Sequence, residues 1–90
     1  MTIHIPTPTE AAAMAAALPP TERDVAADLQ RQAKTTIDNP DSTLYEIFNA
    51  QDALVATITG IGHVDTAEMS DDDWTAYGHL VDAAMEADLS

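Results

Sequence analysis

The chain has no cysteine, one tryptophan, two tyrosines, one phenylalanine, and no lysine or arginine after Lys34. The absence of cysteine excludes disulfides, thiolate metal sites and a cysteine nucleophile, and it fits a reducing compartment. No apolar run approaches the roughly 20 residues that span a bilayer. The first 17 residues contain no base, so the basic segment of a signal peptide is missing. We therefore expect a cytoplasmic protein.

Bulky apolar side chains are also scarce. Hydrophobic residues make up 46% of the 90 residues, but 17 of them are alanine. A chain of this length forms one domain with a modest core. We expect a single acidic helical domain over residues 1–90, either marginally stable as a monomer or covering its apolar side in a homodimer.

Negative charge is distributed unevenly along the chain. Residues 1–34 carry four acids and all three bases, whereas residues 35–90 carry twelve acids and no base, and the net charge is −13. Nucleic acids and anionic membranes attract positive charge, so this asymmetry disfavours direct binding to either. It favours a basic protein surface as the partner, reached with electrostatic steering.

Caps and apolar periodicity predict an all-α fold, a small three- or four-helix bundle with short connections. Thr7-Pro-Thr-Glu10 has the pattern of a capping box with proline at the first helical position, and an alanine-rich helix follows to Leu18. Pro19-Pro20 ends that helix, and Thr21–Asp24 begins the second. The predicted apolar side of the second helix comprises Val25, Leu29, Ala33 and Ile37.

The third and fourth helices have the clearest boundaries. Thr43–Glu46 predicts a capping box, Gly60 suits the position after a helix end, and Ser70–Asp73 predicts an N-cap followed by first-turn carboxylates. The apolar stripe of the third helix comprises Leu44, Ile47, Phe48, Gln51, Leu54, Val55 and Ile58. That of the fourth comprises Trp74, Tyr77, Val81, Ala84, Met85 and Leu89.

Residues 1–6 read as an extended N-terminal arm that ends at a proline. A β-rich alternative would pair Ile3–Ile5 with Ile58–Val64.

No residue pattern predicts catalysis or a metal site. His4, His63 and His79 lack the spacing that places two imidazoles on one metal, and Asp71–Asp73 does not match a calcium loop. No serine lies in a nucleophile motif. We expect no cofactor, no metal and no enzymatic activity.

The candidate partner-binding residues are mostly carboxylates of the C-terminal part. On the fourth helix, Asp72, Thr75, His79, Asp82 and Glu86 recur at steps of three and four, on the side away from Trp74 and Val81. Carboxylates one turn apart lie about 5–6 Å from each other, a spacing comparable to that of backbone phosphates. Tyr45 lies beside the third helix's stripe, which favours an exposed contact, whereas Trp74 and Tyr77 are expected in the core. The full candidate set is Asp65, Glu68, Asp71, Asp72, Asp73, Asp82, Glu86 and Tyr45.

In its length, acidic pI, predicted helices, lack of a catalytic motif and acid-only half from Asp38 to Asp88, the chain resembles small acidic phage-encoded inhibitors of the anti-CRISPR and DNA-mimic type. The resemblance implies a non-enzymatic protein that occupies the nucleic-acid site of a host defence complex. Two alternatives remain open. One is an antitoxin-like or assembly partner of a basic protein, and the other is a halophile-type housekeeping domain whose acidity supports solubility alone.

Overall fold

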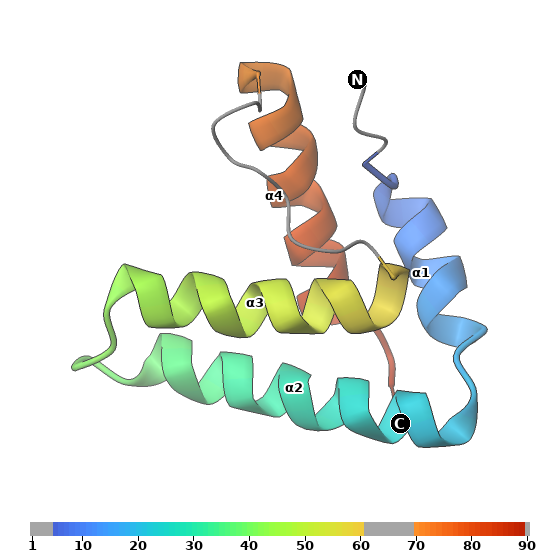
Figure 1. Ribbon diagram of the computed structural model, residues 1–90, viewed down its shortest axis with the longest axis horizontal. Helices are drawn as coiled ribbons and strands as arrows, with labels where there is room; N and C mark the ends of the chain where they lie inside the picture. Colours follow the sequence, from blue (N-terminus) through green and yellow to red (C-terminus); the bar gives the residue numbers. More distant parts are fainter. Residues whose placement is uncertain (1–4, 61–69, 90) are drawn as a thin grey trace.

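The computed structural model describes residues 5–60 and 70–89, and its regular secondary structure there is entirely α-helical. The four helices are α1 (Pro8–Ala16), α2 (Pro20–Asp38), α3 (Leu44–Thr59) and α4 (Asp71–Glu86) (Figure 1). The all-α prediction is confirmed. The β-rich alternative would pair Ile3–Ile5 with Ile58–Val64. Ile5 has no regular secondary structure and Ile58 is helical, whereas residues 1–4 and 61–69 lie outside the described part.

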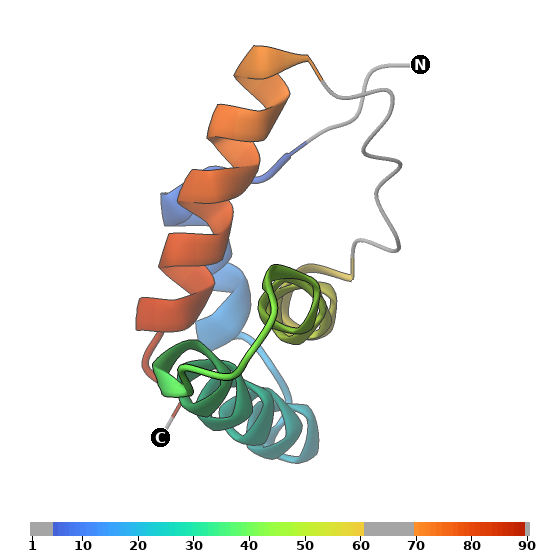
Figure 2. The ribbon, with the colours of Figure 1, turned by 90° about the vertical axis from the view of Figure 1, so that its left-hand side faces the viewer.

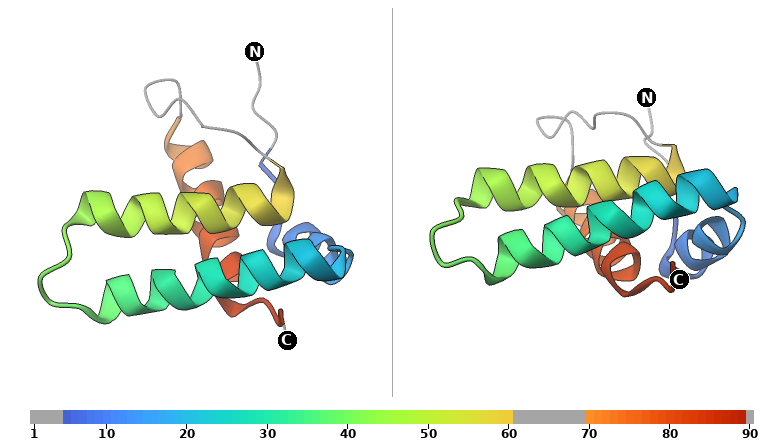
Figure 3. Two further views of the ribbon diagram at one scale, coloured as in Figure 1. Left: turned by 60° about the horizontal axis from the view of Figure 1, so that its bottom comes forward. Right: turned by 90° about the horizontal axis from the view of Figure 1, so that it is seen from below.

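The helices form two layers. Helices α2 and α3 make an antiparallel hairpin, while α1 and α4 lie side by side and cross it at a steep angle (Figures 1 and 2). The loop end of the hairpin extends past both α1 and α4 in each view of Figure 3. The molecule is correspondingly flat, with extents of 34 × 34 × 18 Å. Part of the hairpin's surface is therefore left without a covering helix.

The predicted capping box of α1 forms in full, and α4 begins with a second box where the sequence predicts a serine N-cap followed by first-turn carboxylates. In α1 the Thr7 hydroxyl accepts from the Glu10 N–H, and the Glu10 carboxylate accepts from the Thr7 N–H, both at 3.2 Å. Ser70 and Asp73 make the same reciprocal pair at the start of α4, again at 3.2 Å. These bonds satisfy backbone donors that the first helical turn leaves unpaired.

The other helix ends depart in detail from their predictions. Thr43 accepts from the Glu46 N–H, but the Glu46 carboxylate accepts from the Thr43 hydroxyl, which replaces the predicted bond to the backbone. Pro20 is the first residue of α2 and no side chain caps that end, so α2 begins one residue before Thr21. Gly60 ends α3 as expected, with φ +73° and its N–H bonded to the Ala56 carbonyl.

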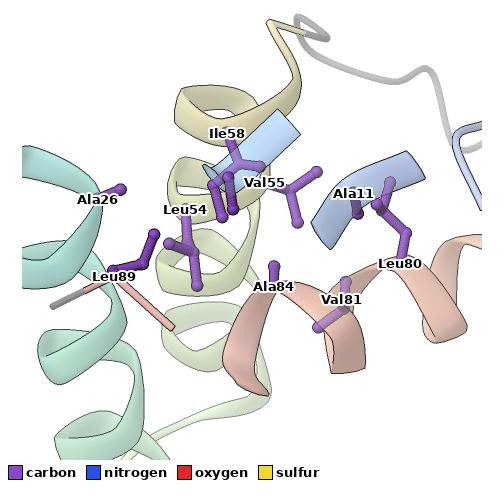
Figure 4. Close-up of a cluster of buried hydrophobic side chains, with 10 residues drawn as sticks. Ala11, Ala26, Leu54, Val55, Ile58, Leu80, Val81, Ala84 and Leu89 are labelled. Carbon is purple, nitrogen blue, oxygen red and sulfur yellow. The ribbon is translucent and has the colours of Figure 1, made fainter. Parts of the chain in front are cut away.

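Alanine makes up much of the core. The buried hydrophobic residues of the described part are Ala11, Ala15, Ala26, Ala33, Leu54, Val55, Ile58, Leu80, Val81, Ala84 and Leu89. All except Ala33 form one cluster (Figure 4). Leu54 and Leu80 are the largest fully buried side chains. Small side chains at helix contacts allow the axes to approach closely, so the core closes with few bulky residues.

Three of the predicted apolar stripes need correction. Val25 and Ile37 are 49% and 43% exposed, and α2 buries Ala26 and Ala33 instead. The reason is that alanine at the contact lets α2 sit close to its neighbours, while Ile37 lies toward the uncovered end of the hairpin. On α3, Leu44 is 70% exposed, and Leu89 is buried but follows the end of α4 at Glu86. The other corrections to α3 and α4 concern Phe48 and Trp74, which belong to the site described below.

The side-chain amide of Gln30, on α2, caps the C-terminal end of α4. The Gln30 side-chain nitrogen donates to the carbonyls of Ala84, Met85 and Ala87, each at 3.0 Å. These carbonyls lie at the C-terminal end of the helix, where backbone acceptors have no intrahelical donor. Gln30 thus fixes α4 against the hairpin.

Candidate partner-binding site

The outward side of α4 carries most of the candidate carboxylates. Asp71, Asp72, Asp82 and Glu86 are exposed, as is His79 between them. Asp73 is half-buried because its carboxylate accepts the bond from Ser70. The structure does not gather these acids in one place, since Asp72 and Asp82 are about 15 Å apart along the helix axis.

The cations of the chain lie away from this surface. Arg23 donates to the Ala16 carbonyl at 2.8 Å and so caps the end of α1, while Arg31 pairs with Asp28 on α2. In residues 5–60 and 70–89, no basic side chain comes within ion-pair distance of Asp72, Asp82 or Glu86. These three carboxylates are therefore available to solvent and to a bound partner.

Beside this acidic side lies an apolar groove of about 550 Å³ between α3 and α4. Its α3 wall consists of Phe48, Gln51 and Asp52. Its α4 wall consists of Trp74, Thr75, Tyr77, Gly78, His79, Val81 and Asp82. The groove therefore shares Thr75, His79 and Asp82 with the acidic side of the helix, and the two features form one continuous surface.

The aromatic residues of the groove are more exposed than the sequence predicts. Trp74 is 47% exposed and Phe48 is 57% exposed, so the prediction that Trp74 lies in the core is wrong. Phe48 belongs to the same stripe as the buried Val55 and Ile58, but it lies on the part of α3 that no other helix covers.

Tyr77 links the α4 wall of the groove to the α3 wall. Its side chain is half-buried and packs against the core, and its hydroxyl donates to the Asp52 carboxylate on α3. Burial raises the pKa of the Tyr77 hydroxyl above its ordinary value, and the hydrogen bond to Asp52 and the charge of that carboxylate raise it further. Tyr77 is thus a weaker acid than a free tyrosine.

Gly78 lies in the middle of α4 and in the wall of the groove. Its φ is not positive, and a Cβ placed on it would have no atom within 4 Å. Glycine in a helix interior costs roughly 0.5–1 kcal/mol relative to alanine. Neither backbone conformation nor packing within the described chain calls for glycine here.

The remaining candidates fall elsewhere. Tyr45 is 76% exposed on α3, in agreement with the prediction of an exposed side chain, but it does not line the groove. Asp65 and Glu68 lie outside the described residues.

Sequence patterns alone miss the groove residues Phe48, Asp52 and Gly78. One signal could have indicated them. The α3 stripe extends from Leu44 to Ile58, 15 residues or about 22 Å, whereas α1 has nine residues, about 14 Å, so α1 cannot cover the full stripe at any crossing angle. A glycine inside an otherwise regular helix is a second such signal.

Within residues 5–60 and 70–89, no three His, Asp or Glu side chains are grouped so as to hold a metal ion. No helix there has the length and hydropathy needed to cross a membrane. No family model, curated protein or solved structure matches the chain, so its function is argued from this surface alone.

Proposed function

We propose that this protein is a non-enzymatic acidic binding protein whose partner is a basic protein surface. The observation that carries the proposal is the exposed set of carboxylates on α4 without cations from the described chain. Such charges are weakly attracted across water, but the attraction increases when an interface excludes solvent. A partner rich in lysine and arginine supplies the missing counter-charges.

The groove itself offers poor material for catalysis. Nucleophilic catalysis needs a hydroxyl beside an oriented base, but the Thr75 hydroxyl donates to the Asp71 carbonyl and the Tyr77 hydroxyl donates to Asp52, so neither is bonded to the imidazole of His79 in the groove wall. The proposal is therefore binding without chemistry.

In its finer form, the proposal is that the basic surface is the nucleic-acid site of the partner, and that this chain inhibits by occupying it. Asp82 and Glu86 are one helical turn apart, with a spacing suited to a groove that accepts phosphates. Among Asp72, Asp82 and Glu86, only Asp82 and Glu86 have this phosphate-like spacing, because Thr75 and His79 occupy the turns between Asp72 and Asp82.

A matched pair of triple reversals tests the role of α4. The test variant is Asp72→Lys, Asp82→Lys and Glu86→Lys. The control is Glu22→Lys, Asp24→Lys and Asp38→Lys, which reverses three exposed acids of α2, including one in the first turn and the last residue. The change in net charge is thereby matched, and so is the helix-dipole effect of the first-turn and last-residue reversals. We expect the α4 variant to lose its partner in a lysate of the source organism, and the α2 variant to retain it.

Elution distinguishes the forms of the proposal. A retained protein released both by salt and by a 20-base-pair DNA duplex supports occupation of a nucleic-acid site. Release by salt but not by DNA supports a basic partner and overturns the mimicry. Equal binding by both triple variants overturns the assignment to α4.

A further inference from the structure

We infer that the groove between α3 and α4 binds an amphipathic helix of the partner protein, whose bulky apolar side chains enter the groove and whose lysine or arginine side chains flank it. The inference rests on the proposed function, because it specifies which part of a basic partner this chain would hold. It goes beyond that function by assigning the contact to an apolar site as well as a charged one.

Two aromatic side chains lie on facing walls of the groove. Trp74 and Phe48 remain about half exposed although both belong to stripes that continue into the core. Large aromatic residues that line a concave site are the usual anchors of protein recognition. Helix-in-groove recognition uses such a site, with apolar side chains of the bound helix entering from one face.

The charge of the rim selects the occupant. Asp52 and Asp82 lie on opposite walls of the groove, and no lysine or arginine is among the residues that line it. A second copy of this chain would bring a net charge of −13 against the same rim, so self-association is opposed by repulsion. A basic and apolar helix matches both the rim and the walls.

The glycine in the wall has an explanation in the same occupant. A side chain at position 78 would project into open space within the chain itself. A helix packed on α4 would instead fill that space, and glycine allows the closest approach of the two backbones. The helix-weakening residue is thus placed where a partner would pack.

The size of the groove sets the length of the contact. From Trp74 to Asp82 the α4 wall spans about 12 Å, which corresponds to about two turns of a bound helix. Apolar residues at positions i, i+3 or i+4, and i+7 of the partner would therefore face the groove.

Three synthetic 18-residue peptides without tryptophan test the inference. The first combines a leucine face with lysine, the second has the same leucine face with glutamate, and the third permutes the first so that no apolar face remains. Trp74 is the chain's single tryptophan and lines the groove, so its emission reports occupancy directly. We expect the first peptide to shift this emission to the blue and to bind at least tenfold more tightly than the other two.

Two variants then localise the contact. Gly78→Leu places a bulky side chain in the groove wall at an exposed position where an added Cβ meets no neighbour, and we expect it to weaken binding of the first peptide at least tenfold. Ala53→Leu adds the same side chain at an exposed position of α3 outside the groove and should leave binding unchanged. Circular dichroism of both variants checks that the fold persists.

The outcomes separate this inference from the proposed function. Three results would overturn the assignment of the groove as a helix-binding site: equal binding of the first and permuted peptides, no binding of the first peptide, or binding that Gly78→Leu does not change. None of these would affect the result of the α4 triple reversal. A tryptophan shift that grows with protein concentration without peptide, and that Gly78→Leu abolishes, would show that a second copy fills the groove and would also overturn it. Failure of the triple-reversal test alone overturns the acidic face and leaves the peptide result valid.

Discussion

At the scale of single residues, Gln30 connects α2 to the end of α4, across 54 to 57 residues of sequence. Its amide has two hydrogens and serves three carbonyls at the end of α4. We predict that Gln30→Leu lowers the free energy of unfolding by about 1–3 kcal/mol, because it leaves partly buried carbonyls without a donor. Gln32→Leu, at an exposed position of the same helix, is the matched control and should change stability little. Urea denaturation of both variants measures the difference, and equal midpoints would contradict the capping role.

We expect ionisation of Tyr77 to lower the stability of the fold at alkaline pH. The ordinary tyrosine pKa is about 10, and the folded value is higher because of burial and Asp52. As pH rises, the unfolded state therefore releases this proton first. The stabilisation is fully present below pH about 10 and is lost as the pH rises toward the folded pKa. We predict that Tyr77→Phe flattens this alkaline decline in melting temperature.

Absorbance supplies a direct check on the same group. In a Tyr45→Phe variant Tyr77 is the single tyrosine. Its phenolate signal should appear well above the ordinary pKa or together with unfolding. A titration at the ordinary tyrosine pKa with the fold intact would show that the Tyr77–Asp52 bond does not persist in solution.

At the scale of helices, two leucines of the same α3 stripe differ in burial and therefore in their expected contribution to stability. Leu54 is fully buried, whereas Leu44, ten residues earlier on α3, is 70% exposed. We predict that Leu54→Ala costs about 2–5 kcal/mol of stability and that Leu44→Ala costs less than about 0.5 kcal/mol. Thermal denaturation of the two variants compares them, and similar losses would mean that the loop end of the hairpin is covered in solution.

This contrast also explains what sequence patterns could predict. Helix starts depend on a few adjacent residues, so the capping box at Thr7 and the N-cap at Ser70 were identifiable. Whether a stripe is covered depends on the length and angle of other helices. Leu54 and Phe48 therefore look equivalent in sequence, although one is core and the other lines the groove.

The candidate site divides in the same way. Exposure of Asp72, Asp82 and Glu86 follows from helical periodicity and was predictable. The groove beside them requires the crossing of α3 and α4, which no local pattern specifies.

At the scale of the whole molecule, the net charge of −13 acts across a body 34 Å in extent. The Debye length falls from about 30 Å at 0.01 M salt to about 8 Å at 0.15 M, so salt screens the repulsion between distant acids. We predict that the melting temperature rises over this range. The two triple reversals each bring the net charge from −13 to −7, since each reversal adds two units.

Comparison of the triple variants locates the repulsion. An equal fall in salt dependence would attribute it to net charge, and a larger fall in the α4 variant would attribute it to that helix. A melting temperature independent of salt would contradict the prediction. A need for molar salt to fold would instead favour the halophile-type alternative.

The amide cap on α4 has a consequence for the order of events in folding. Gln30 and its three acceptors are separated by 54 to 57 residues, so the bonds cannot form until the two halves of the chain have met. Closing a loop of that length carries an entropic cost that local helical turns avoid. The last turn of α4 should accordingly become ordered after the rate-limiting step, and Gln30→Leu should speed unfolding while leaving the folding rate nearly unchanged.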